Sequence, residues 1–187
     1  MTTSSFKRSE TSPQTHCTYC NKKDKRFGWF SGAQIYQIIF SYDPDRLTVC
    51  PFVSSLQKVK NMTFKEGQEF KVRIRPQDSC SSFAINIGHD SENVAMHFNA
   101  RFDCQGDTNT IVFNSLSGGS WGDELREGNF PFVRGEECKF HINFNNEQFY
   151  IKLPDGSMLN FPNRLGDVKY QYFDVSGEAR IVGIKIK

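Results

Sequence analysis

Residues 96–102 of the 187-residue chain read Met-His-Phe-Asn-Ala-Arg-Phe, and apolar and polar side chains alternate along the stretch. Successive side chains of a β-strand point to opposite faces of its sheet, so this alternation predicts a half-buried strand. The apolar face would pack on a core. The other face would present three hydrogen-bonding side chains, spaced about 6.8 Å apart along the strand: His97, Asn99 and Arg101.

The same period of two continues on both sides of this stretch, from about Leu56 to the end of the chain. Alternating runs occur at residues 70–75, 83–87, 111–114, 140–145, 149–153 and 182–187. Turn sequences containing Gly, Asp and Asn separate the runs, and the spacing typical of helices is nearly absent. Many short strands at intervals of roughly 8–12 residues predict an all-β sandwich or barrel, with enough chain for two packed antiparallel sheets.

The first part of the chain has a different character. Residues 1–26 are rich in Ser, Thr, Lys and Arg, and we expect them to be mobile. Residues 27–53 contain enough aromatic and branched side chains for one or two strands, or for a segment that adheres to the domain surface. We therefore separate an N-terminal extension (residues 1–54), partly disordered and of unidentified role, from a folded domain (residues 55–187).

Charge and hydropathy exclude several classes of protein. The chain carries 23 basic and 21 acidic side chains, a formal net charge of +2, which excludes a general polyanion binder driven by net charge and predicts no nucleic-acid partner. No stretch approaches the ~18 consecutive apolar residues of a membrane span, so no membrane insertion is expected. The N-terminus lacks the apolar region of a secretory signal, so we expect the six cysteines to be reduced thiols made in the cytosol.

The stretch His16-Cys17-Thr18-Tyr19-Cys20 looks like half of a zinc knuckle. A structural zinc ion needs four ligands, and no second pair of Cys or His follows at a useful spacing. The ligand count therefore favours two ordinary thiols in a flexible arm. We expect no metal and no cofactor.

Four further candidate residues follow the stretch 96–102. Asn114 ends the next run and shares the outward face if the apolar residues of that run point to the core. Trp121 has two glycines before it and one after, which leave its indole poorly covered. Glu124 and Arg126 are two residues apart and therefore share a face.

Such a set of side chains suits the recognition of a sugar. A pyranose has a face of C–H groups, which stacks on an aromatic plane, and a rim of hydroxyls, which needs donors and acceptors of mixed type. Charged partners strengthen these hydrogen bonds, and guanidinium and carboxylate groups allow bidentate contacts. A site that surrounds the axial hydroxyl of galactose would reject the glucose epimer, because its buried polar groups would be left unpaired.

The spaced motifs His97-x-Asn99-x-Arg101, Val112-x-Asn114 and Trp121-Gly122-x-Glu124-x-Arg126 resemble the signature of the galectins, a family of β-galactoside-binding lectins. The resemblance covers roughly residues 55–187. It implies that this segment is a carbohydrate-recognition domain with the galectin-type jelly-roll sandwich of two antiparallel sheets. It also implies metal-free binding of lactose and N-acetyllactosamine termini.

The resemblance further implies a role for each residue. His97, Asn99 and Arg101 would contact the galactose O4 hydroxyl, Asn114 and Glu124 would contact O6, and Trp121 would stack under the ring. Arg101, Glu124 and Arg126 would reach the O3 hydroxyl of the second sugar. Two positions depart from the family pattern: Gln105 stands where many single-domain members have His, which would retune contacts beyond the disaccharide, and Ala100 replaces a frequent Pro.

An enzyme is the main rival class. A glycoside hydrolase needs two carboxylates that flank the scissile bond, one of them a general acid. Glu124 would lie beside Arg101 and Arg126, which favour its charged form, and Asp123 would point to the opposite face. A second alternative is a galectin-fold scaffold that binds protein and has weak or lost sugar binding, against which the intact set of seven residues argues. We therefore predict a lectin and not an enzyme.

The resemblance is to single-domain galectins, which pair through terminal edge strands, here residues 57–62 and 180–187. An exposed edge offers backbone groups to a second copy, so a homodimer that cross-links β-galactoside-bearing glycans and glycoproteins is allowed. The N-terminal extension enters beside the first edge and would either block pairing or add a contact. The expected location is the cytoplasm, and leaderless export to the extracellular space is compatible with the sequence.

Overall fold

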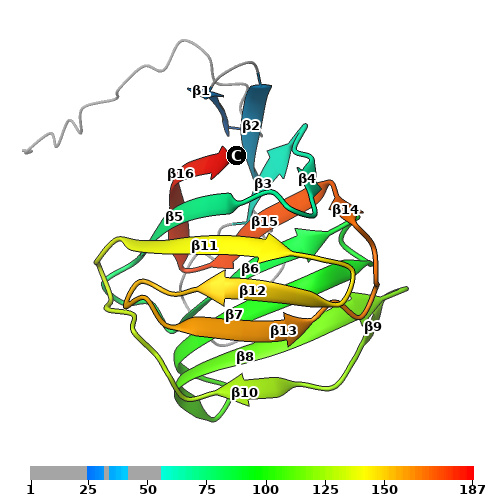
Figure 1. The fold of residues 1–187 in the computed structure, drawn as a ribbon. Coiled ribbons are helices and arrows are strands. Elements are labelled where there is room, and N and C mark those ends of the chain that lie inside the picture. The colour runs from blue at the N-terminus through cyan, green and yellow to red at the C-terminus, as the bar shows by residue number, and fades with distance from the viewer. Residues whose placement is uncertain (1–24, 32–33, 42–55) are drawn as a thin grey trace, which may run out of the picture.

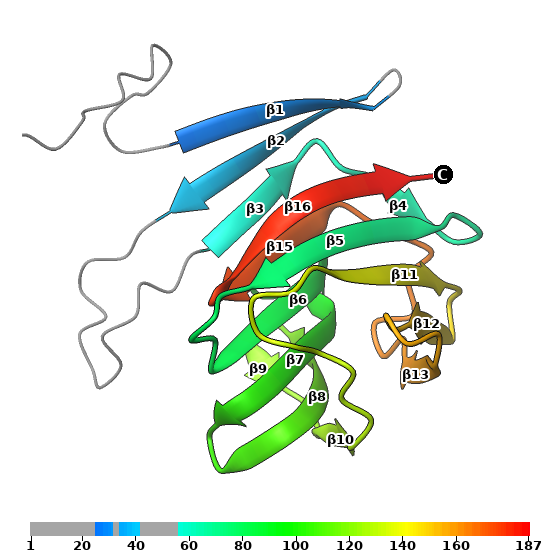
Figure 2. The same ribbon diagram turned by 90° about the vertical axis from the view of Figure 1, so that its left-hand side faces the viewer.

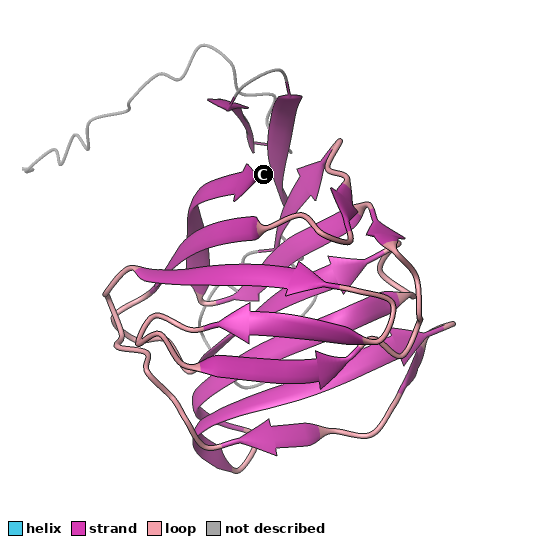
Figure 3. Cartoon of the chain, viewed as in Figure 1, coloured by secondary structure: helices cyan, strands magenta, loops and turns pink. Residues whose placement is uncertain are grey.

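The computed structural model of the chain describes residues 25–31, 34–41 and 56–187, and its regular elements there are strands (Figure 3). No helix in this part of the chain is long and apolar enough to cross a membrane. The strands are β1 (Lys25–Ser31), β2 (Gln34–Ser41), β3 (Leu56–Lys60), β4 (Phe64–Lys65), β5 (Phe70–Pro76), β6 (Ser82–Gly88), β7 (Val94–Cys104), β8 (Asp107–Ser117), β9 (Ser120–Trp121), β10 (Leu125–Glu127), β11 (Cys138–Phe144), β12 (Gln148–Lys152), β13 (Met158–Pro162), β14 (Lys169–Tyr170), β15 (Tyr172–Gly177) and β16 (Ala179–Ile186).

These strands form two packed antiparallel sheets (Figure 1). A nine-stranded sheet has the order β1-β2-β3-β15-β6-β7-β8-β10, and β9 pairs with β8. A five-stranded sheet has the order β13-β12-β11-β5-β16, and β14 pairs with β4 in a short third sheet. Hairpin-connected neighbours alternate with neighbours that are far apart in sequence, such as β15 and β6 or β5 and β16, and this strand order fits a jelly-roll sandwich. The predicted all-β fold with two antiparallel sheets is therefore confirmed.

The core lies between the two sheets and is built largely from aromatic rings. Phe98 of β7 meets Phe140 of β11 edge to face, with ring centroids 5.4 Å apart. Phe113 of β8 stacks on Phe161 of β13 with centroids 5.3 Å apart. Each such pair stabilises the fold by about 0.5–1.5 kcal/mol beyond the burial of its area. This packing gives the strands that carry the candidate site a rigid backing.

The N-terminal hairpin corrects one prediction about the sheet edges. β1 pairs with β2, and β2 pairs with β3 from Gln37 opposite Lys60 to Ser41 opposite Leu56 (Figure 2). The prediction that residues 57–62 form an edge strand is wrong, because the backbone groups that a second copy would use already bond to β2. β16 does end its sheet, as predicted. Of the alternatives for residues 27–53, two strands occur within the described residues. Of residues 1–26, which we expected to be mobile, Lys25 and Arg26 begin β1 instead, and residues 1–24 and 42–55 lie outside the described residues.

Candidate carbohydrate-binding site

The register of the nine-stranded sheet brings the candidate residues to one outward face. His97 lies opposite Asn114, and Asn99 lies opposite Val112, which pairs on its other side with Arg126 of β10. Directly opposed residues of antiparallel strands share a face of the sheet. Together with the contacts described below, this register gathers all seven predicted residues: His97, Asn99, Arg101, Asn114, Trp121, Glu124 and Arg126.

The imidazole of His97 is held in one orientation and one tautomer. Its Nδ1 lies 2.6 Å from Oδ1 of Asn86, and Nδ2 of Asn86 donates to Oδ1 of Asp174 at 2.8 Å. Because the Asn86 oxygen can only accept, Nδ1 of His97 carries the proton and Nε2 is left as an acceptor. Burial, and secondly the charge of Arg101, lower the pKa of His97 to about 4. The ring is therefore neutral at pH 7.

The indole of Trp121 lies exposed beside this imidazole. Its exposed fraction is 54%, which agrees with the prediction that neighbouring glycines leave it uncovered. The turn that delivers it requires glycine, since Gly118 and Gly119 have φ of 55° and 78°. The ring centroids of His97 and Trp121 are 4.9 Å apart at an interplanar angle of 61°. The edge of the imidazole therefore borders an open aromatic plane.

Four charged side chains of alternating sign continue the face beyond Asn99. Arg101 Nη1 donates to Asp107 at 2.6 Å, and Arg126 Nε donates to the other oxygen of Asp107 at 3.3 Å. Glu124 closes the ring of charges, 2.6 Å from Arg126 and 3.7 Å from Arg101. Arg101 Nε also donates to Oδ1 of Asn99 at 3.1 Å, which turns the amide NH₂ of Asn99 outward. Both guanidinium groups and this amide are thus preset donors.

The same hydrogen bonds determine the electrostatics of the charged ring. Hydrogen bonds from Arg101 first, and then from Arg126, hold the pKa of Asp107 below its usual value. The hydrogen bonds of Arg126 to Asp107 and Glu124 raise the pKa of the guanidinium. These side chains stabilise one another in their charged forms. The ring therefore offers strong hydrogen bonds to a neutral polar ligand.

The side-chain oxygen of Asn114 is held by two donors, a backbone N–H of its own strand and the guanidinium group of Arg164. Its Oδ1 accepts from the backbone N–H of Ser115 at 2.8 Å and from Arg164 Nη1 at 3.4 Å. Arg164 also donates to the Ser115 hydroxyl at 3.2 Å and lies over the ring of Phe161. Since Oδ1 is engaged, the amide NH₂ of Asn114 is the group directed to a ligand. Asn114 itself is 5% exposed.

Sequence reasoning missed four residues that position the predicted ones: Asn86, Asp107, Arg164 and Asp174. Asn86 occupies a polar position of the alternating run at 83–87, so its outward direction could have been predicted, but its contact with His97 depends on strand pairing. Asp107 follows a Gly in the turn between two strands, where an acidic residue is ordinary. For Arg164 and Asp174 the sequence carries no signal that we can identify.

The arrangement can bind a neutral polyhydroxylated ring. It combines an exposed aromatic plane with one fixed acceptor, several fixed donors and paired charges, all on one face. Among residues 25–31, 34–41 and 56–187, no three His, Cys, Asp or Glu side chains form a group that could hold a metal ion. Cys17 and Cys20, the half-knuckle of the sequence, lie outside these ranges.

An all-β sandwich that presents an indole among oriented polar side chains defines a carbohydrate-binding protein. A family model described as galactoside-binding lectin matches residues 54–186. The chain therefore belongs to the galactoside-binding lectins, the galectin family, and the predicted resemblance is confirmed. Because members of this family are lectins, the prediction that the chain is not an enzyme is confirmed on the same ground.

Individual relatives agree with this assignment. The beta-galactoside-binding lectin of Electrophorus electricus is 48% identical over 128 residues, which cover 68% of this chain and 95% of that protein. Congerin II, solved with lactose and MES, matches with a TM-score of 0.68 and 33% identity, over 70% of this chain and 98% of that one. CG-16, a homodimeric agglutinin from chicken liver, matches with a TM-score of 0.68 and 37% identity, over 71% and 99% of the two chains.

Proposed function

We propose that this chain is a lectin that binds β-galactosides of the lactose and N-acetyllactosamine type, without a metal, on the outward face of β7, β8, β9 and β10. The observation that carries the proposal is the fixed imidazole of His97. Its Nε2 is an acceptor next to the exposed indole of Trp121, and Arg101 on the same strand supplies donors. One acceptor flanked by donors suits a hydroxyl group, which both donates and accepts.

This triplet explains a preference for galactose over glucose. We assign the axial O4 hydroxyl to His97, Asn99 and Arg101: His97 accepts its proton, while the amide of Asn99 and the guanidinium of Arg101 donate to its oxygen. The C–H face of the same ring would stack on Trp121. A glucose ring, with an equatorial O4, would leave these oriented groups without partners, at a cost of about 1–3 kcal/mol for each buried group.

The remaining residues extend the contact along the ligand. We assign the O6 hydroxyl to Asn114, whose amide NH₂ is directed outward, and to Glu124. The O3 hydroxyl of the second sugar would meet Arg101, Glu124 and Arg126. Arg126 and Glu124 have side chains that are 49% and 39% exposed, so they suit the less enclosed end of a disaccharide. The partners of the protein would be glycans and glycoproteins that end in such units.

Cross-linking of glycans requires two sites in one assembly. We assign the pairing surface of a homodimer to the edge of β16, because β2 covers β3. Glycoconjugates with terminal β-galactosides are displayed outside cells, so we further propose that the chain leaves the cytoplasm without a leader. Release of the protein from cell surfaces by lactose, but not by sucrose, would be the expected sign of that location.

Isothermal titration of the full chain with lactose tests the proposal, with glucose and mannose as matched controls. We expect saturable binding of one lactose per chain, no measurable binding of the controls, and an unchanged isotherm in EDTA. Equal heats for all three sugars, or loss of lactose binding in EDTA, would contradict the proposed site. Hydrolysis of lactose in the same sample would point to an enzyme instead.

A further inference from the structure

The second face of the sandwich has a charge pattern that the galactoside site does not use. The five strands of the smaller sheet carry seven basic side chains and no acidic one. Residues 56–187 as a whole carry 16 basic and 17 acidic side chains. The rest of that segment is therefore markedly acidic, and positive charge is concentrated on one sheet. The small net charge of the whole chain conceals this separation.

The basic side chains point away from the core. On β5 the buried residues alternate with exposed or half-exposed ones, and the same alternation occurs on β11 and β12. Two of the seven basic residues have an acidic partner: Lys71 pairs with Glu69 at 3.0 Å and Arg73 with Glu137 at 3.1 Å. Within the described part of the chain, no ion pair is found for the other five: Arg75, Lys139, Lys152, Arg180 and Lys185.

Strand register arranges these cations in rows across the sheet. Lys185, Lys71 and Lys152 lie in register with His141 on four consecutive strands, a row of about 14 Å at the usual strand spacing, and Glu69 pairs with both Lys71 and His141 within that row. In a parallel row, Lys139 lies opposite Arg73. Like charges that face each other across strands repel. An anionic ligand laid along a row would remove that repulsion.

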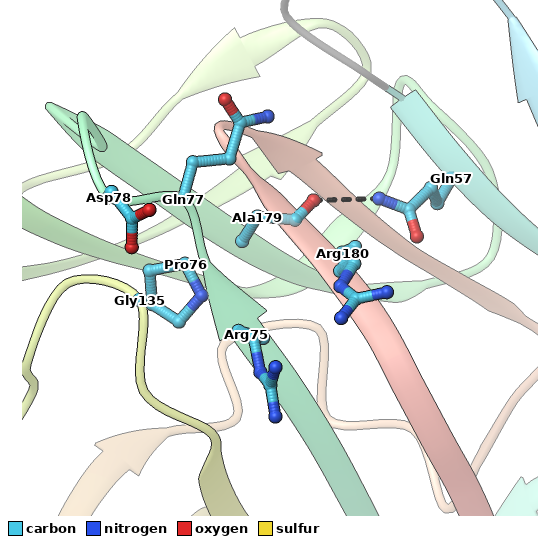
Figure 4. A pocket seen from close by; sticks show the side chains of 8 residues that line it. All are labelled: Gln57, Arg75, Pro76, Gln77, Asp78, Gly135, Ala179 and Arg180. Atoms are coloured by element: carbon cyan, nitrogen blue, oxygen red, sulfur yellow. Dashed lines mark hydrogen bonds between the residues drawn. The ribbon is translucent and has the colours of Figure 1, made fainter.

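The clearest instance of like charges facing each other across strands is the pair Arg75 and Arg180, which lie directly opposite each other on β5 and β16. Both side chains line a hollow of about 380 Å³, and Figure 4 shows them on the same side of the two strands. Asp78 is the acidic residue of that lining, so the hollow is positive overall. Two guanidinium forks in one hollow provide bidentate donors for a tetrahedral oxyanion.

We propose that the outward face of β16, β5, β11 and β12 is a second binding site, for a sulfated linear polysaccharide. A chain of this kind carries discrete anionic groups at regular intervals along a line. One sulfate would enter the hollow between Arg75 and Arg180, and the following groups would lie along the rows formed by Lys139, Lys185 and Lys152. The site lies on the opposite sheet from the galactoside site, so both would be occupied at once.

The same face is poorly suited to two other polyanions. Single-stranded nucleic acid is held by stacking on exposed rings, and the outward ring of β12, Tyr150, is partly covered. Insertion into a membrane surface needs exposed apolar side chains, and Met158 on β13 is the large exposed one that these five strands supply among the described residues. Charge complementarity with arginine forks favours sulfate groups.

Binding of the full chain to heparin, a sulfated polysaccharide, tests this proposal. The variant Arg75→Ser/Lys139→Ser/Arg180→Ser removes three charges from the face. The control Lys60→Ser/Lys65→Ser/Lys169→Ser removes three exposed charges carried by other strands, so the net charge changes equally. We expect the face variant to bind heparin about tenfold more weakly at 0.1 M salt and the control to change by less than about twofold. Saturating lactose should leave heparin binding intact.

Each other result would overturn the proposal. Equal losses in both variants would mean that heparin responds only to net charge. No loss in the face variant would place binding elsewhere, for example on the basic extension, and competition by lactose would place it at the galactoside site. The protein could instead bind a single-stranded oligonucleotide or phosphatidylserine vesicles more tightly than heparin, with the loss again confined to the face variant. That result would identify a different ligand for this face. Unchanged lactose affinity in the variants serves as the check on folding.

Discussion

The two sheets of this sandwich differ in whether their outward charged side chains have partners of opposite sign. On the nine-stranded sheet, Arg101 and Arg126 share Asp107 and Glu124, so each charge of the proposed galactoside site is compensated within the protein. On the five-stranded sheet, Arg75 and Arg180 face each other with no ion pair among the described residues. Internal pairing fixes side chains for a neutral ligand that needs directed hydrogen bonds. Unpaired like charges repel each other, and a ligand of opposite charge would relieve that repulsion.

The largest expected change in lactose affinity distinguishes the two sheets by replacing one exposed apolar side chain on each. Trp121→Ala removes the stacking plane of the galactoside site and should weaken lactose binding by about 2–3 kcal/mol, roughly 30- to 150-fold. The matched control is Met158→Ala, since Met158 is equally exposed (54%) but lies on the five-stranded sheet. Calorimetry should detect no change in lactose affinity for the control. Similar losses in both variants would mean that neither face is the lactose site.

A second prediction concerns the dependence of lactose affinity on pH, which should report the protonation of the His97 imidazole. The lowered pKa of His97, about 4, keeps Nε2 an acceptor well below the pH at which an ordinary histidine becomes charged. Lactose affinity should therefore stay flat from pH 8 to about 5.5 and fall as pH drops through 4, by about tenfold one unit lower. The hydrogen bonds from Arg101 and Arg126 likewise favour the charged form of Asp107, because they lower the pKa of that carboxyl.

The pH prediction is checked by lactose titrations in a buffer series, with circular dichroism at each pH to confirm that the fold persists. The ¹⁵N shifts of the His97 ring report its tautomer directly and should show a protonated Nδ1 at pH 7. Loss of affinity near pH 6.5 would show that the ring titrates like an exposed histidine. In that case Asn86 and Asp174 would not hold it as the geometry indicates.

The sequence predicts which side chains of a strand face outward, but not which strands are neighbours in a sheet. The alternation at 96–102 determines which side chains face outward, and the alternation of the next run places Asn114 with them. Trp121, Glu124 and Arg126 join this site in the sequence analysis only through the resemblance to the galectin signature. The position of Asn86 beside His97 depends on the pairing of β6 with β7, and Asp174 is 88 residues from Asn86. Such contacts follow from strand order, which no local pattern encodes.

The basic face was hidden for the same reason. Each of its strands shows one to three basic residues at outward positions, which is ordinary for a solvated strand. They form rows only because β16, β5, β11 and β12 are neighbours, although β16 and β5 are about 100 residues apart. The whole-chain charge of +2 averages this face with the acidic remainder. A global count therefore excluded a polyanion partner that the arrangement of the strands favours.

The smallest expected effect concerns the edges of the two sheets. The hairpin of β1 and β2 extends the larger sheet past β3, whereas β16 ends the smaller one (Figure 2). Deletion of residues 1–54 uncovers the backbone groups of β3, which a second copy can then pair with alongside β16. We expect the deletion to tighten dimerisation about tenfold, or 1.4 kcal/mol, as measured by sedimentation equilibrium.

The matched control for this edge effect is deletion of residues 1–24, which retains the hairpin and should behave like the full chain. If both deletions change the mass equally, the effect belongs to the first 24 residues and not to the covered edge. Identical masses for the full chain and both deletions would mean that β3 takes no part in pairing, covered or not. A tighter dimer for the longer deletion alone would show that the hairpin, by occupying one edge, leaves β16 as the pairing surface.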